Sequence, residues 1–92
     1  MDINELREQI NKIDREIVDL YGKRMEIARA IGRYKQEHNL PVLDSGREKE
    51  LLDKVAEQAG EENRPGVRAL YRLLLEHSRR RQEEDRRTEQ RQ

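Results

Sequence analysis

Apolar residues recur along the first third of the chain at steps that alternate between three and four residues. They are Ile3, Leu6, Ile10, Ile13, Ile17, Leu20, Ile27, Ile31 and Tyr34. This spacing is typical of a helix that packs along its whole length, and it predicts a helix over about residues 2–37. Such a helix is roughly 50 Å long. Because a rigid helix cannot fold back on itself, something else must cover its apolar stripe.

A break separates this helix from a second one. Pro41 disfavours the helical conformation at Leu40, and either Asp44 or Ser45 can cap a following helix. The second helix is predicted over about residues 46–59, with its apolar residues on one side. It is therefore expected to pack against another element through that side.

The third helix is predicted to begin near Val67, after a loop over residues 60–66. Its inward-facing residues are predicted to be Leu70, Tyr71, Leu74 and Leu75. No hydrophobic residue follows Leu75, so we expect a single domain over residues 1–82 and a polar tail over 83–92 that frays or is disordered. With no strand pattern and no repeat, the prediction is an all-α fold of one long, one short and one medium helix.

The composition indicates how such a chain completes its core. Only 33% of the 92 residues are hydrophobic and 43% are charged. This mixture suits a disordered chain, a long exposed helix, or a small domain that completes its core with a partner. The sequence has no cysteine, which excludes a disulfide framework and thiolate zinc sites.

Charge and hydropathy exclude several classes of partner. The 20 basic and 20 acidic residues give a formal net charge of zero, so no global field draws the chain to nucleic acid or anionic lipid. Apolar runs are too short to span a membrane, and the N-terminus lacks the basic start and apolar core of a secretory signal. We therefore expect a cytoplasmic protein with no membrane or nucleic-acid partner.

A basic residue interrupts the apolar stripe of the first helix. Arg24 stands seven residues after Ile17, where the spacing predicts an apolar residue. Lys35 lies on nearly the same face, about 16 Å from Arg24 between Cα atoms. Burying an unpaired guanidinium is costly, so Arg24 needs an anionic partner. Because both side chains are long, they can converge on one small anionic ligand between them. Alternatively, Arg24 pairs with a glutamate or extends into solvent.

Two neutral polar residues continue the inward face of the third helix. Ser78 and Gln82 follow Tyr71 and Leu75 at helical steps. They can present hydrogen-bonding groups to a ligand. The alternative is that the helix has left the core at this point and that both residues are solvated.

Arg47 and Glu48 open the second helix. The run Ser45-Gly46-Arg47-Glu48 fits the S-x-x-E capping box. In that arrangement Glu48 only satisfies backbone amides and Arg47 is a surface charge. Both residues can also belong to a ligand site.

Other polar clusters have no predicted role in chemistry. The run from Arg79 to Arg81 is typical of a solvated face, and the acidic residues 83–85 cancel its charge, although an inward Arg79 would alter the charge of a pocket. His38 and His77 lack metal-ligand spacing, and no phosphate-binding loop or nucleophile motif is present. The sequence thus predicts neither a metal site nor covalent catalysis.

Taken in order, these segments resemble the all-helical AroQ-type class of chorismate mutases. The stretches that carry the resemblance are LREQI at 6–10 with Asp14, KRMEIA at 23–28, IGRYK at 31–35, PVLD at 41–44, Arg47-Glu48, LEHS at 75–78 and Gln82. Each stretch alone is a weak signal. Their shared order and separation over residues 3–82 make the resemblance specific.

The resemblance implies an intertwined homodimer with two equivalent active sites, each built mainly in one protomer and completed by the other. It thereby supplies a partner for the long apolar stripe. Arg7 lies roughly 25 Å from Arg24 along the same helix, so it cannot reach the same small ligand in its own chain. An antiparallel second copy can deliver Arg7 across the interface.

By resemblance, the chain converts chorismate to prephenate, an intramolecular Claisen rearrangement in phenylalanine and tyrosine biosynthesis. It does so by binding the compact diaxial conformer, without a cofactor. Chorismate carries two carboxylates, and arginine binds a carboxylate through two hydrogen bonds. The resemblance assigns this binding to Arg7 of the second subunit, Arg24 and Arg47, with Ser78 assisting.

The resemblance also assigns the residues that face the reacting bond. Lys35, Gln82 and Arg24 are the expected catalytic residues, with Lys35 and Gln82 donating hydrogen bonds to the ether oxygen where negative charge gathers. Glu48 and the loop around Asp44 are expected to hold the ring hydroxyl. Some relatives have a glutamate in place of Gln82, which must be protonated to donate, whereas an amide donates at any ordinary pH. We therefore predict an activity that does not collapse above neutrality.

Three alternatives stay open. An isochorismate-pyruvate lyase shares this architecture and a similar cationic pocket, although Gln82 and the loop over 44–48 favour the mutase. A non-catalytic helical dimerisation module is the second, and it predicts that Arg24→Ala is neutral or stabilising. The third is a regulatory or fused role, because such domains also precede a prephenate dehydratase or dehydrogenase. The sequence alone is interpreted as a monofunctional or excised domain.

Overall fold

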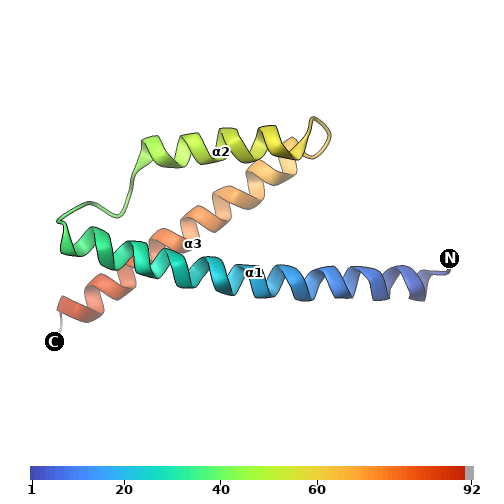
Figure 1. Ribbon diagram of the computed structural model, residues 1–92, viewed down its shortest axis with the longest axis horizontal. Coiled ribbons are helices and arrows are strands. Elements are labelled where there is room, and N and C mark those ends of the chain that lie inside the picture. Colours follow the sequence, from blue (N-terminus) through green and yellow to red (C-terminus); the bar gives the residue numbers. More distant parts are fainter. Residues whose placement is uncertain (91–92) are drawn as a thin grey trace.

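The computed structural model describes residues 1–90 and has three helices in that range. They are α1 (Ile3–Glu37), α2 (Ser45–Ala59) and α3 (Arg64–Gln90). α3 crosses α1 and packs against both α1 and α2 (Figure 1). No apolar stretch long enough to cross a membrane occurs in a helix of this range. The predicted all-α fold of one long, one short and one medium helix is confirmed.

Both ends of α1 are closed by local hydrogen bonds. Asp2 caps the start, where its carboxylate accepts from a backbone N–H three residues on at 2.9 Å. At the other end Asn39 has a φ of 55°, the left-handed conformation that asparagine tolerates. The N–H of Leu40 donates to the carbonyl of Lys35 at 2.7 Å, and that of Asn39 to Gln36 at 3.2 Å. This pair of bonds is a Schellman motif, which turns the chain out of the helix.

Asp44 caps α2 rather than Ser45. Its carboxylate accepts from the backbone N–H of Arg47 at 3.1 Å, and Ser45 is already the first helical residue. The capping box predicted for Ser45 and Glu48 is therefore wrong, because the carboxylate one residue earlier takes the capping position. As a result, Glu48 is released from the backbone for another contact.

α3 begins earlier and ends later than the sequence predicts. It starts at Arg64 instead of near Val67, with Pro65 in the first turn, where the missing N–H of proline removes no helical hydrogen bond. It continues to Gln90, through most of the segment for which a frayed or disordered tail is predicted. The last two residues of that predicted tail, 91–92, lie outside the described residues.

Polar contacts hold the C-terminal part of α3 against α1 and the segment after it. Arg29 donates two hydrogen bonds of 3.0 Å each to the carboxylate of Asp85. These bonds, together with the negative charge of Asp85, raise the pKa of the Arg29 guanidinium above its usual value. The next residue, Arg86, donates to the carbonyl of Leu40. A hydrophobic pattern does not reveal such contacts, so it underestimates the length of this helix.

The N-terminal part of α1 extends beyond the other two helices (Figure 1). The radius of gyration is 16.7 Å, compared with about 12 Å for a compact domain of this length. Ile3, Ile10 and Ile17 of the apolar stripe are 58%, 57% and 55% exposed. The buried hydrophobic residues of the described chain are Ala28, Val42, Val55 and Ala56. A single copy therefore leaves most of the stripe uncovered.

Candidate active site

A pocket of about 610 Å³ lies where α1, α3, the start of α2 and the segment before α2 come together. Its lining is Leu20, Lys23, Arg24, Ile27, Ala28, Ile31, Lys35, Val42, Asp44, Arg47, Glu48, Leu51, Tyr71, Leu75, Ser78, Arg79 and Gln82. Aliphatic side chains thus form one part of the wall, and charged, amide and hydroxyl groups and the Tyr71 ring form the rest. This combination is typical of a site for a small polar ligand.

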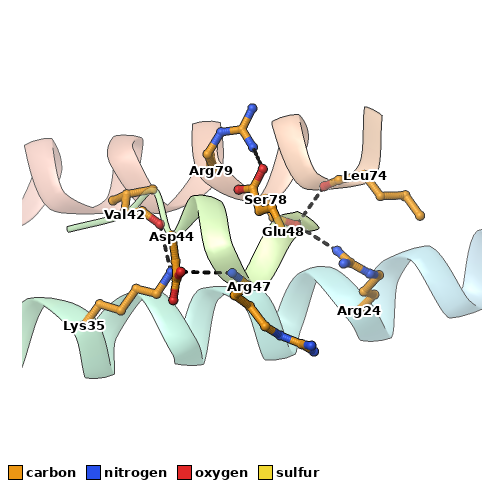
Figure 2. Close-up of polar contacts among 9 residues, drawn as sticks. All are labelled: Arg24, Lys35, Val42, Asp44, Arg47, Glu48, Leu74, Ser78 and Arg79. Carbon is orange, nitrogen blue, oxygen red and sulfur yellow. Dashed lines mark hydrogen bonds and ion pairs between the residues drawn. The ribbon is translucent and has the colours of Figure 1, made fainter. Parts of the chain in front are cut away.

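Arg24 is held by a neutral partner on α3. Its guanidinium donates to the Ser78 hydroxyl at 2.9 Å, and that hydroxyl donates to the carbonyl of Leu74 at 2.8 Å (Figure 2). The guanidinium also lies 5.9 Å from the centre of the Tyr71 ring. The predicted alternative that Arg24 pairs with a glutamate is therefore wrong. The remaining guanidinium hydrogens have no carboxylate partner within residues 1–90.

Lys35 is tied to the segment before α2. Its ammonium group donates to the carbonyl of Val42 at 2.8 Å (Figure 2). Val42 is buried, so this carbonyl is a fixed acceptor. An ammonium group has three hydrogens, and this contact uses only one of them. The other two stay available at the pocket wall.

Gln82 is one of the most buried residues of the site, at 5% exposure. Its amide nitrogen donates to the carbonyl of Ala28 at 2.7 Å. A carbonyl only accepts hydrogen bonds, so this contact decides which end of the amide faces α1 and leaves one N–H unused. Ser78 is buried as well, at 8% exposure. The alternative that Ser78 and Gln82 are solvated is wrong.

The carboxylate of Glu48 contacts Arg79 of α3 rather than the backbone (Figure 2). The expectation that Arg79 belongs to a solvated basic face is therefore wrong, whereas Arg80 is exposed and pairs with Glu76 at 2.9 Å. Arg79 stands four residues after Leu75, on the inward face of the helix. That spacing is the signal by which the sequence could have placed it.

The pocket carries an excess of positive charge. Four of its cations form no ion pair within residues 1–90, namely Lys23, Arg24, Lys35 and Arg47. Of the two lining carboxylates, Asp44 caps α2 and Glu48 is paired with Arg79. Arg24 and Lys35 are partly buried, whereas Lys23 and Arg47 are exposed, and partly buried cations without counter-ions favour an anionic ligand. The pocket is therefore suited to a small molecule with more than one negative charge.

The structure brings together all but one of the predicted site residues. Those that line the pocket are Arg24, Lys35, Asp44, Arg47, Glu48, Ser78 and Gln82. Arg7 does not line it, because it lies in the exposed N-terminal part of α1. This placement agrees with the expectation that Arg7 cannot reach the pocket of its own chain.

Comparison with known proteins connects this pocket to an enzyme family. The family model for chorismate mutase type II matches residues 6–83, a range that contains every residue lining the pocket. The chain belongs to the chorismate mutase type II family. The predicted resemblance to the AroQ-type class is thus confirmed, and the chain is a chorismate mutase domain of that family.

Three similar proteins show how much of this chain, and of each of them, the sequence similarity covers. The chorismate mutase of Methanocaldococcus jannaschii is 29% identical over 77 residues, which are 80% of this chain and 77% of that protein. The bifunctional chorismate mutase/prephenate dehydratase of Aquifex aeolicus is 39% identical over 54 residues, 59% of this chain but only 15% of that protein. A solved structure, a conserved hypothetical protein from Pyrococcus furiosus, has 40% identity and a TM-score of 0.74 over 87% of this chain and 93% of that one.

Proposed function

We propose that the chain catalyses the rearrangement of chorismate to prephenate. The observation that carries this proposal is the set of cations around the pocket that have no counter-ion within residues 1–90. Chorismate is a dianion, so it supplies the missing negative charge. Membership of the chorismate mutase type II family supports the same substrate.

The two carboxylates of chorismate are bound by arginines in this proposal. Arg24 and Arg47 line the pocket without an ion pair, and a guanidinium can bind a carboxylate through two parallel hydrogen bonds. Ser78 holds Arg24 in place from α3. These contacts bind the substrate in the folded conformer in which the two reacting carbons are close.

Lys35 and Gln82 stabilise the transition state. As the bond between the ether oxygen and the ring breaks, negative charge develops on that oxygen, and hydrogen-bond donors already in place lower the barrier. Lys35 donates one hydrogen to the carbonyl of Val42, and Gln82 donates one to the carbonyl of Ala28. The tether restricts the side chain, and its remaining hydrogens serve the ether oxygen. The reaction needs no proton transfer, nucleophile or cofactor.

Glu48 and Asp44 complete the site on the side of α2. Both carboxylates line the pocket beside the cations. A carboxylate accepts hydrogen bonds, and the ring hydroxyl of chorismate is a donor. We assign the hydroxyl to Glu48, with the segment around Asp44 closing that side.

A second copy of the chain completes the protein in this proposal. The apolar stripe of α1 stays exposed, with Leu6 at 48% and Ile13 at 52%, and an identical antiparallel helix offers a matching stripe. Such a partner also carries its own Arg7 toward the pocket, which Arg7 of the same chain cannot reach. The product is an intertwined homodimer with two sites, each completed across the interface.

The assay follows the loss of the ultraviolet absorbance of chorismate by wild type, Lys35→Ala and Lys49→Ala. Lys49 is an exposed lysine of α2 outside the pocket, so its variant should match wild type. Lys35→Ala should be slower by about 10²-fold or more, because it removes a transition-state donor. No turnover by wild type would refute the proposed function, and release of pyruvate from isochorismate instead would identify a lyase.

A further inference from the structure

Arg79 joins α3 to the carboxylate of Glu48 at the wall of the pocket. The residue follows directly after Ser78, and its guanidinium donates to Oε1 of Glu48 (Figure 2). The side chains of Arg79 and Glu48 are only 31% and 20% exposed. The pair is therefore partly shielded from water, where an ion pair orients its partners more strongly than on an open surface.

The contact leaves one side of the Glu48 carboxylate unused. Oε1 accepts from Arg79, whereas Oε2 accepts no hydrogen bond from a residue of the described range. A carboxylate that is anchored through one oxygen has fewer orientations available for the other. The second oxygen is consequently presented at the pocket wall in a restricted direction.

We propose that Arg79 is a positioning residue for the reaction, which acts by orienting Glu48 so that its free oxygen accepts a hydrogen bond from the ring hydroxyl of the substrate. This inference rests on the proposed function. It distinguishes Arg79 from the other arginines of the pocket. Arg24 and Arg47 have no carboxylate partner within residues 1–90 and remain for the substrate, while the charge of Arg79 is compensated by Glu48.

The role predicts a particular kinetic signature. The ring hydroxyl is not part of the bonds that break and form, so a contact to it is similar in the ground state and the transition state. Losing a contact of this kind raises KM and leaves kcat nearly unchanged. We expect Arg79→Leu to raise KM about tenfold with kcat within about threefold of wild type. Loss of Lys35 or Gln82 should instead lower kcat.

A double-mutant cycle separates positioning from direct binding. The four proteins are wild type, Arg79→Leu, Glu48→Ala and the double variant, each assayed with chorismate. If Arg79 acts through Glu48, the substitution at 79 should change KM by less than about twofold once Glu48 is absent. Independent, multiplicative effects of the two substitutions would overturn the proposal, because they would mean that Arg79 contacts the substrate itself.

Two matched variants test whether a change in KM is due to the Arg79 side chain or to a general loss of structure. Arg79→Lys keeps a cation at the same place and should recover KM to within about threefold of wild type. Arg80→Leu removes the neighbouring arginine, which is exposed and lies outside this pocket, and should match wild type. Circular dichroism melting of each variant shows whether the helices are intact, and should Arg79→Leu not fold, the cycle is repeated with Arg79→Gln.

The failure of this inference is distinguishable from the failure of the proposed function. A wild-type protein that leaves chorismate unchanged refutes the proposed function. A wild-type protein that converts chorismate, together with an Arg79→Leu variant of equal KM, overturns only the role of Arg79. A raised KM that Arg79→Lys recovers and that disappears in the Glu48→Ala background supports the role.

Discussion

Gly32 of α1 and Gln82 of α3 lie so close that a Cβ atom at position 32 would be 2.6 Å from the Cγ of Gln82. The missing side chain is what lets the Gln82 amide reach the carbonyl of Ala28. In the middle of a helix glycine is otherwise less stable than alanine. Its position here is explained by the close approach of the two helices at the pocket.

We therefore expect Gly32→Ala to displace Gln82. The added methyl group should lower the free energy of unfolding by about 1–3 kcal/mol through overpacking and kcat by about tenfold or more through loss of the placed donor. Gly22→Ala is the matched control, because nothing lies within 4 Å of its added Cβ, and it should stabilise α1 by about 0.5–1 kcal/mol. Urea unfolding and chorismate turnover measure both effects. Equal behaviour of the two variants would contradict the role of Gly32.

The pH dependence should follow the identity of residue 82. An amide donates a hydrogen bond whatever the pH, so the wild-type rate should stay flat between about pH 6 and 8. In Gln82→Glu only the protonated carboxyl can donate, so the rate should fall about tenfold per pH unit above the pKa of that group. Both pH–rate profiles come from the same chorismate assay. A wild-type rate that itself falls tenfold per pH unit over this range would exclude the proposed role of Gln82.

Arg24→Ala separates an enzyme from a helical dimerisation module. Arg24 has no carboxylate partner within residues 1–90, so its removal should leave the fold intact. In a catalytic site the rate should fall by about 10²-fold or more. In a dimerisation module the same change should be neutral or stabilising, with no activity to lose in either protein. Thermal melting and turnover, measured on the same samples, decide between the two.

The C-terminal end of α3 should matter for activity. Asp85 and Arg86 bind Arg29 and the carbonyl of Leu40, and the segment that begins at Leu40 carries the carbonyl that holds Lys35. Ending the chain at Glu83 should loosen that segment and lower kcat/KM by about three- to tenfold. A chain that ends at Gln90 is the control. If the shorter chain matches it, residues 84–90 do not contribute to the activity, as expected for the frayed polar tail that the sequence predicts.

The helices could be predicted from the sequence because each depends on local rules. The apolar spacing of α1 and the proline and aspartate before α2 place the start of each helix within one residue of the observed start, and both predicted ends agree with the observed ones. The C-terminal end of α3 is different, because it depends on contacts such as Arg29 with Asp85. These residues are distant in the sequence, and no local pattern links them.

The candidate site could be predicted only where a polar residue interrupts an apolar face. Arg24, Ser78 and Gln82 are recognisable in this way because helical spacing calls for an apolar side chain or an inward group there. Arg79 occupies an inward position too, but the two residues after it are also arginines. Its role therefore becomes clear only from the residue that it contacts. That partner, Glu48, equally fits a capping box until the structure shows Asp44 as the cap. One-residue differences in helix start thus decide what a carboxylate contacts.

Subunit complementation tests the shared site directly. Arg7→Ala and Lys35→Ala should each be nearly inactive, yet a mixture refolded together from denaturant should regain activity. Half of the dimers are then mixed, and each mixed dimer has one site with an intact Lys35 and an intact partner Arg7. Recovery should be about one quarter of the wild-type rate for a symmetric two-site dimer. A mixture of Arg24→Ala with Lys35→Ala is the control and should stay inactive, because both residues come from the same protomer. Recovery in neither mixture would show that Arg7 does not act across an interface, since every site then depends on one chain alone.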